Sequence, residues 1–297
     1  MRGLLLACAS ILLAASVAAA APQHRKVGEQ IAVATASGRI VLVDAGGHRL
    51  ATLSKRAGRL VSDWAPAWSP DGEWLAFARS TDGRRSFHVY LMRADGSGVR
   101  RLTHGRFDES PAWSPDGRWI AYVSTSGIRI VHPNGRGSRA IRGTGIVGAH
   151  YTEIYGTFPS WTPKGRLSYS FHAEMSSDWP ASCRTARARC GWVLTSDLNG
   201  RNRRPVLRGR DAHWSLDGRV VVFTPSNGGV AILTGGRRRL LGRGYKPNWS
   251  PDGTRIVYAR LGQTAIGDAI WIMSFNGRGA HRIMKGASDP AWRPGGA

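Results

Sequence analysis

Short runs of alternating apolar and polar residues, separated by turn signals, recur along most of the chain. The clearest runs are EWLAFAR (73–79), RWIAYVS (118–124), RVVVFTP (219–225) and TRIVYAR (254–260). A period of two is typical of a β-strand, because successive side chains point to opposite faces. Each run carries an aromatic residue five positions after a turn glycine, so these residues share one face of their strands: Phe77, Tyr122, Phe223 and Tyr258.

A seven-residue motif with tryptophan at its third position precedes these strands. It is PAWSPDG at 66–72 and again, unchanged, at 111–117; the related motifs are PSWTPKG (159–165), AHWSLDG (212–218), PNWSPDG (247–253) and PAWRPGG (290–296). Ser-Pro-Asp-Gly favours a tight turn, because proline presets φ and glycine tolerates a positive φ. We therefore expect the acids of this motif to cap turns rather than bind ligands: Asp71, Asp116, Asp217 and Asp252.

Each repeat continues with a third strand, a hairpin signal and a basic fourth strand. The hairpin signals are Gly46-Gly47, Asp95-Gly96, Asn134-Gly135, Asn199-Gly200, Gly235-Gly236 and Asn276-Gly277. Four strands repeated about every 35–53 residues are typical of a β-propeller blade. Residues 31–53 supply three strands without a tryptophan motif, and the motif at 290–296 supplies a first strand with nothing after it. Joined, they complete six blades, so the predicted fold class is all-β, a six-bladed β-propeller closed between its terminal strands.

The tryptophan motif, the aromatic second strand and the following Asp/Asn-Gly and Arg-Leu-Thr segments resemble the TolB-type propeller repeat. The resemblance covers nearly the whole chain after its first residues, and it implies the fold rather than one function. Similar propellers precede the hydrolase domain of prolyl-oligopeptidase relatives, but the chain contains no Gly-x-Ser-x-Gly motif.

The first 21 residues have the pattern of an export signal. Arg2 precedes an apolar stretch from Leu4 to Ala21 that ends in four alanines. A basic head, an apolar middle and a small-residue end predict a signal peptide (1–21) cleaved after Ala20 or Ala21; an uncleaved membrane anchor is the alternative. The predicted mature chain, 22–297, is a single propeller domain, monomeric, periplasmic or extracellular, and not integral to the membrane.

Cys183 and Cys190 are the only cysteines after the predicted signal peptide. In an oxidising compartment, two cysteines seven residues apart can close a small disulfide loop. A metal site is the alternative, but two ligands do not make a zinc site, and Arg184, Arg187 and Arg189 between them would repel a cation. We expect a disulfide, no metal and no cofactor.

The fourth blade, counting from residue 31, carries two insertions that fall on one face of the ring. They are 143–158 and 171–191, and long loops on a rigid scaffold are common binding sites. The alternative is a surface lobe held by its disulfide. The residues we expect this lobe to present for binding are His150, Tyr151, Glu153, Tyr155, His172 and Trp179.

Acidic residues recur three to five positions before the tryptophans, where the first strand should approach the central channel. In the order of the chain they are Asp63, Asp108, Glu109, Asp211 and Asp289, with Glu153 further upstream of its tryptophan. Together they could hold a cation or a basic peptide. Alternatively, each caps local backbone or pairs with a neighbouring arginine.

The formal net charge is +23, and arginine supplies nearly all of the basic residues. Many arginines lie near the start of the fourth, outermost strands, where charge discourages edge-to-edge pairing: Arg100, Arg101, Arg139, Arg203, Arg204, Arg237, Arg238, Arg239 and Arg282. Such a perimeter could also bind an acidic polymer weakly through its phosphates or carboxylates. The chain lacks the basic, aromatic-rich segments of sequence-reading modules, so we expect no specific nucleic acid.

The sequence thus favours an exported, non-catalytic scaffold that binds a protein or peptide of the cell envelope or the exterior through its channel face. An enzyme is the main alternative, because the resemblance includes TolB-like propellers that are polysaccharide lyases with histidine-held metal. The histidines considered for such a site are His104, His150, His172 and His213, and no HxxxH or HxH spacing supports it. A weak polyanion binder is the third possibility.

Overall fold

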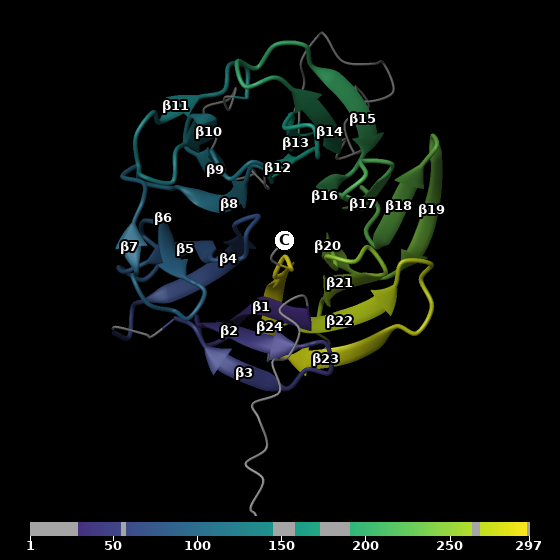
Figure 1. Ribbon diagram of the computed structural model, residues 1–297, viewed down its shortest axis with the longest axis horizontal. Helices are drawn as coiled ribbons and strands as arrows, with labels where there is room; N and C mark the ends of the chain where they lie inside the picture. The colour runs from purple at the N-terminus through teal and green to yellow at the C-terminus, as the bar shows by residue number, and fades with distance from the viewer. Residues whose placement is uncertain (1–28, 55–57, 145–157, 173–190, 263–267, 296–297) are drawn as a thin grey trace, which may run out of the picture.

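In the computed structural model, the chain forms a ring of six four-stranded antiparallel sheets around a central axis (Figure 1). The structure describes residues 29–54, 58–144, 158–172, 191–262 and 268–295. Every named element within these residues is a β-strand. None of them contains a helix long and apolar enough to cross a membrane. The predicted all-β, six-bladed propeller is confirmed.

Blade one joins the two ends of the chain. Its strands, from the axis outward, are β24 (Ala287–Trp292), β1 (Gln30–Thr35), β2 (Ile40–Asp44) and β3 (Arg49–Thr52). Ile31 pairs with Trp292 and Ala32 with Ala291, so the last strand lies against the first. The ring therefore closes as the sequence predicted, and β1 has no open edge.

The other blades follow in chain order, each from the axis outward. Blade two is β4 (Ser62–Trp68), β5 (Trp74–Ser80), β6 (His88–Arg93) and β7 (Arg100–Arg101); blade three is β8 (Glu109–Trp113), β9 (Ile120–Ser124), β10 (Gly127–Val131) and β11 (Arg139–Ala140). Blade four is β12 (Ser160–Trp161), β13 (Leu167–His172), β14 (Gly191–Ser196) and β15 (Arg204–Arg208). Blade five is β16 (Arg210–Trp214), β17 (Val220–Thr224), β18 (Val230–Thr234) and β19 (Arg237–Gly242); blade six is β20 (Tyr245–Trp249), β21 (Arg255–Arg260), β22 (Ala269–Ser274) and β23 (His281–Lys285).

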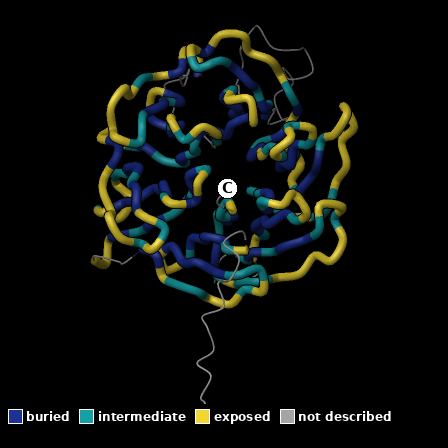
Figure 2. The backbone as a smooth tube through the Cα atoms, viewed as in Figure 1, coloured by how far each residue is buried: buried dark blue, intermediate teal, exposed yellow. Residues whose placement is uncertain are grey.

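The hydrophobic core lies between adjacent blades, and Figure 2 shows burial along the inner and middle strands with exposure on the outer ones. The motif tryptophans connect these layers. The indole nitrogens of Trp68, Trp161 and Trp249 donate hydrogen bonds to main-chain oxygens in the innermost strand of the preceding blade, at 3.2, 3.0 and 3.2 Å. These three tryptophans therefore also join their blade to the preceding one, whereas the indole nitrogens of Trp113, Trp214 and Trp292 are buried without a hydrogen-bond partner among the described residues.

The Ser-Pro-Asp-Gly turns have the predicted role. The Asp71 carboxylate accepts hydrogen bonds from the Ser69 hydroxyl and the Glu73 amide, and the same pattern recurs at Asp116, Asp217 and Asp252. The hairpin glycines have a packing role as well. A Cβ on Gly47, whose φ is +85°, would lie 2.0 Å from the Ile283 carbonyl oxygen of blade six, so only glycine fits this seam.

Candidate functional site

A β-bulge interrupts the innermost strand just before the tryptophan motif in blades one, two, three, five and six. The residue before the motif takes a positive φ without being glycine: Ala65 (49°), Ser110 (52°), Asp211 (53°), Lys246 (50°) and Asp289 (52°). Phe158 holds the same sequence position in blade four. Because a bulge redirects side chains out of strand alternation, it lets each blade place one residue by the axis.

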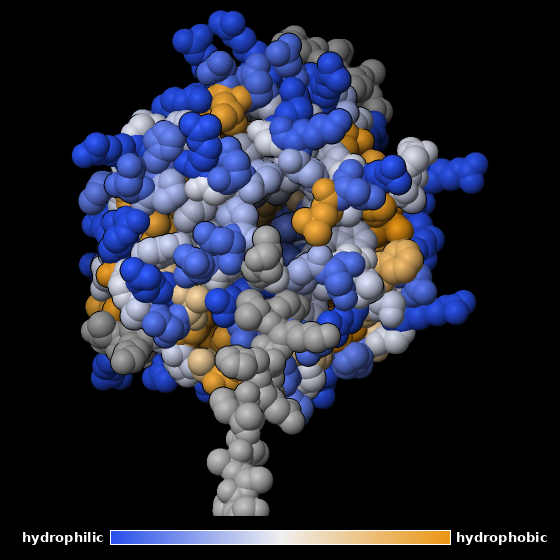
Figure 3. All heavy atoms as spheres, viewed as in Figure 1, coloured by the Kyte–Doolittle hydropathy of each residue, from blue (hydrophilic) through white to orange (hydrophobic). Residues whose placement is uncertain are grey.

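Lys246 is the centre of the group that these bulges form. Its ammonium makes an ion pair with the Asp289 carboxylate and lies 5.4 Å from the centre of the Phe158 ring. Burial alone would lower the pKa of Lys246, but the charges of Asp289, Asp211 and Glu109 outweigh it and raise that pKa. Side chains from blades one, three, four and five thus act on one ammonium group of blade six at the axis, where Figure 3 shows a hollow in a largely hydrophilic face.

The carboxylates of this group differ in whether their oxygen atoms have hydrogen-bond partners. Asp211 is buried; its Oδ2 accepts from Arg210 Nη1 at 3.1 Å, while its Oδ1 is buried with no hydrogen-bond partner in the described part of the chain. Glu109 Oε2 accepts from Trp64 Nε1 at 3.3 Å. Burial raises the pKa of Glu109, and the Trp64 hydrogen bond and the Lys246 charge only partly offset this. The site therefore has unused capacity to accept hydrogen bonds or positive charge.

Trp64 of β4, which bonds Glu109, is the first of three aromatic residues in contact; Phe87 lies in the loop between β5 and β6, and Phe107 in the loop between β7 and β8. Trp64 meets Phe87 edge-on, with ring centres 5.2 Å apart, and Phe87 lies 5.1 Å from Phe107. The guanidinium groups of Arg84 and Arg106 lie 5.7 Å from the Trp64 ring and 5.2 Å from the Phe107 ring. We call Trp64, Phe87 and Phe107 the aromatic cluster. All three are half-buried, which leaves part of each ring available for contact.

The loop that carries Phe87 is held by its own hydrogen bonds. The Asp82 carboxylate accepts from the Ser86 hydroxyl at 2.6 Å and from the Arg85 and Ser86 amides at 3.0 Å, and these bonds lower the pKa of Asp82 to about 2. The Arg84 amide donates to the Ser80 hydroxyl at 2.7 Å while Arg84 takes a φ of 72°. Phe87 of the aromatic cluster is therefore presented by a preformed turn.

Asp63 and Asp108 have local structural roles, contrary to their assignment to the site from the sequence. Asp63 forms a buried two-point ion pair with Arg79, at 2.6 and 2.9 Å. Asp108 is buried and accepts a hydrogen bond from the Gly105 amide at 2.7 Å. Both acids stand five residues before a tryptophan, whereas Glu109, Asp211 and Asp289 stand four or three before theirs. Asp211 and Asp289 are bulge residues and Glu109 directly precedes the bulge residue Ser110, and these positions place all three acids near Lys246.

Several residues predicted for the site lie outside the described residues. They are His150, Tyr151, Glu153, Tyr155 and Trp179, together with both cysteines of the predicted disulfide, Cys183 and Cys190. His172 ends β13, where its backbone pairs with Gly191. Of the other histidines considered, His213 contacts Asn248 at 3.1 Å. Within the described ranges, no three His, Cys, Asp or Glu residues lie close enough to hold a metal ion.

Sequence reasoning missed Lys246, Phe158 and the aromatic cluster. Lys246 and Phe158 were detectable, because each directly precedes the proline of its tryptophan motif, the position that Asp289 holds in blade one. Neither residue is acidic, so the pattern of recurring acids does not include them. The aromatic cluster has no such signal, since Trp64 comes from a first strand and Phe87 and Phe107 from two separate loops.

A family model described as the TolB beta propeller domain matches residues 12–179, more than half of the chain. The chain belongs to the TolB β-propeller family. The search of curated proteins finds no sequence that matches this TolB-family chain.

Solved structures support the same fold. A chain of a nidogen/laminin complex aligns with a TM-score of 0.65 at 12% identity, covering 90% of this chain and 99% of that one. A putative TolB from Agrobacterium tumefaciens aligns with a TM-score of 0.62 at 16% identity, covering 90% and 94%. An oligogalacturonate lyase in complex with manganese aligns with a TM-score of 0.50 at 15% identity, covering 88% and 75%. At these identities the likeness concerns the fold alone.

Proposed function

We propose that this TolB-family propeller is an exported, non-catalytic scaffold that binds a protein or peptide partner at the axis of its ring. The partner presents a basic side chain to Glu109, Asp211 and Asp289 and an apolar segment to the aromatic cluster. The observation that carries this proposal is the Lys246 ammonium itself. It lies among these carboxylates and near the Phe158 ring, which supports a site that accepts a cation.

Charge and composition at the axis support a basic ligand. The whole chain carries a formal net charge of +23, yet carboxylates converge where the blades meet. These carboxylates attract a cation, and solvent screens the attraction only weakly because the site is partly buried. Aromatic residues and arginine are also enriched at protein–protein contacts, and Arg84 and Arg106 lie over two rings of the aromatic cluster. A similar propeller occurs in a nidogen/laminin complex, which agrees with a protein-binding role.

A triple substitution tests the proposal. Peptides selected on the wild-type protein from a random phage-displayed library should be rich in lysine or arginine. Replacing the three carboxylates (Glu109→Gln, Asp211→Asn, Asp289→Asn) should weaken their binding at least about tenfold, because charge-assisted hydrogen bonds are lost. Fluorescence anisotropy with a labelled selected peptide measures the change.

The matched control replaces three turn acids that follow the innermost strands at the end opposite the bulges, Asp71→Asn, Asp116→Asn and Asp252→Asn. This variant removes the same charge, and it should bind the peptide within about twofold of wild type. Wild-type binding should also weaken as the pH falls through the raised pKa of Glu109, since protonation removes a negative charge. Equal losses in both triple variants, or selected peptides without basic residues, would contradict the proposal.

Export belongs to the proposal and rests on the sequence of residues 1–21. Expression of the full chain in a bacterial host should yield a periplasmic or secreted product whose first residue is Ala21 or Pro22. N-terminal sequencing of that product, with intact mass as a check, measures the cleavage site. A product that keeps Met1 and sediments with membranes would show an anchor instead.

A further inference from the structure

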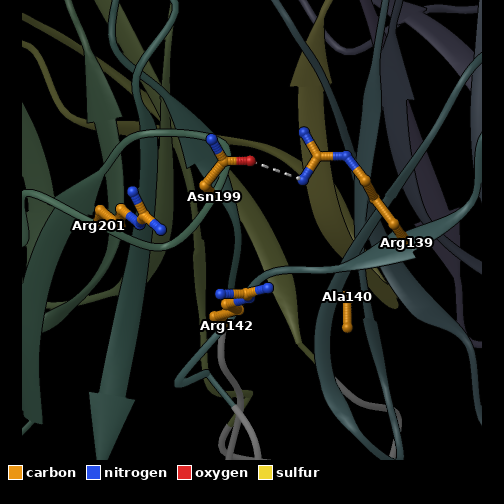
Figure 4. Close-up of a pocket in the computed structure, with 5 residues that line it drawn as sticks. All are labelled: Arg139, Ala140, Arg142, Asn199 and Arg201. Carbon is orange, nitrogen blue, oxygen red and sulfur yellow. Dashed lines mark hydrogen bonds between the residues drawn. The ribbon is translucent and has the colours of Figure 1, made fainter.

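A cleft lined by arginines lies at the perimeter, where blade three meets blade four. Its volume is about 490 Å³, and its lining residues are Arg139, Ala140, Arg142, Asn199 and Arg201. Figure 4 shows the three guanidinium groups and the Asn199 amide around one space. No acidic residue is part of this lining. The cleft is distinct from the axial site, and its size is within the range of about 300–1,000 Å³ that is common for ligand pockets.

Arg139 is held in place as one wall of the cleft. Its Nη1 donates to the Leu198 carbonyl oxygen at 2.5 Å and to Asn199 Oδ1 at 3.5 Å, both on the hairpin of the next blade. Its guanidinium also lies 5.6 Å from the Trp119 ring. Because these bonds use one nitrogen, other N–H groups of Arg139 stay available to a ligand.

Arg142 and Arg201 supply charge that the protein does not use. Within the described residues, neither side chain forms a hydrogen bond or an ion pair, and only their backbones are engaged. Both are exposed. At other seams a perimeter arginine bonds the next hairpin, as Arg100 does to Pro133 and Arg239 to Asn276. Arg139 matches that pattern. Arg201 follows Asn199-Gly200 as Arg136 and Arg278 follow their own Asn-Gly pairs, so among the three cleft arginines only Arg142 is additional to the repeat.

A two-residue insertion puts Arg142 in the seam. In blades one and two, a buried leucine is followed directly by Ser54 or Thr103, whose hydroxyl oxygen accepts a hydrogen bond from an amide of the third strand of the blade. In blade three the same bond is made by Thr144 to the Ile128 amide, but Arg142 and Gly143 stand between the buried Ile141 and Thr144. The fold does not need these two residues to make this bond.

The walls of the cleft are fixed from both sides. Arg203 of blade four donates from Nη2 to the Arg142 carbonyl oxygen at 2.6 Å and from Nε to the Gly200 carbonyl oxygen at 3.0 Å. A Cβ on Gly200, whose φ is +73°, would lie 2.2 Å from the Arg142 oxygen, so the two blades touch there. Three like charges therefore face one space. The Arg203 hydrogen bonds and the close contact at Gly200 hold the backbones of the two blades together beside it.

We propose that this cleft binds a compact oligoanion with two neighbouring oxyanion groups, of which diphosphate is the simplest. Guanidinium groups bind phosphate oxygens through paired N–H donors, and three of them suit more charge than a single phosphate carries. The Asn199 amide adds a neutral donor beside them. This proposal does not depend on the function of the axial site.

Calorimetric titration with pyrophosphate at fixed ionic strength tests the cleft. The double variant Arg142→Gln, Arg201→Gln should bind pyrophosphate at least about tenfold more weakly than wild type. Orthophosphate should bind the wild-type protein more weakly than pyrophosphate. A titration with tripolyphosphate separates two ligand sources: affinity at least equal to that of pyrophosphate supports a segment of a longer phosphate polymer, and weaker affinity supports a free diphosphate.

The matched control is Arg237→Gln, Arg238→Gln on β19, which removes the same charge from another exposed part of the perimeter. It should change pyrophosphate affinity by no more than about twofold. Equal losses in the two double variants would mean general charge attraction only and would overturn the proposal. The absence of binding heat with wild-type protein, confirmed by an unchanged melting temperature in pyrophosphate, would overturn it as well.

Discussion

Replacing Arg79 with methionine should lower the free energy of unfolding by about 3–5 kcal/mol, because it leaves the Asp63 carboxylate buried without its partner. The Arg79 and Asp63 side chains are only 10% and 1% exposed, and two hydrogen bonds join them. The Arg79 guanidinium also lies 5.1 Å from the Phe77 ring and 5.2 Å from the Tyr90 ring. Methionine keeps much of the apolar part of the arginine side chain, so the decrease in the free energy of unfolding is due mainly to the lost ion pair. Urea denaturation followed by circular dichroism measures it.

Arg219→Met provides the control for that experiment. Arg219 also pairs with an aspartate, Asp217, but at 3.9 Å and with side chains 85% and 56% exposed. An exposed pair of this kind contributes less than about 1 kcal/mol. If Arg79→Met and Arg219→Met have similar effects, the assignment of Asp63 to a buried structural pair is wrong.

Removing the last strand should prevent the ring from closing. A chain that ends at Gly286 lacks all of β24, including the buried residues Trp292 and Ala291. The edge of β1 would then be open, and Trp68 would lose its hydrogen bond to the Ala291 oxygen. We expect this truncated protein to aggregate in size-exclusion chromatography and to lack a cooperative thermal transition.

Two smaller changes in or after β24 serve as comparisons for the chain that ends at Gly286. Trp292→Ala keeps the strand but empties part of the core between blades one and six, and it should destabilise the protein by about 3–5 kcal/mol. A truncation after Arg293 keeps all of β24 and should melt close to the full chain. If the chain ending at Gly286 were monomeric with a wild-type transition, closure by β24 would not matter for stability.

The fold was predictable because the repeat is local. The turn chemistry of Ser-Pro-Asp-Gly and the alternation around Phe77 and Tyr258 each specify a strand or a turn within a few residues. Closure of the ring was predictable as well. Residues 31–53 supply three strands without a first strand, and the motif at 290–296 supplies a first strand without the other three. The interblade hydrogen bonds of Trp68 and Arg139 join different blades, and no local pattern encodes them.

The site was only partly predictable because its geometry depends on the bulge. Asp108 and Glu109 are neighbours in the sequence, yet Asp108 bonds the Gly105 amide while Glu109 faces Lys246. Which of two adjacent acids faces the axis depends on where strand alternation is interrupted, and a left-handed residue before proline has no strong compositional signal. Aligning the repeats by their motif proline, with any residue type allowed, would have revealed Lys246 and Phe158.

A crystal structure of the protein with a selected basic peptide tests the central claim most directly. The account predicts a lysine or arginine side chain of the peptide within hydrogen-bonding distance of Glu109, Asp211 or Asp289, and an apolar residue against Trp64, Phe87 or Phe107. A peptide that lies on the Ser-Pro-Asp-Gly turns, or on the outer strands with the Lys246–Asp289 ion pair untouched, would contradict it.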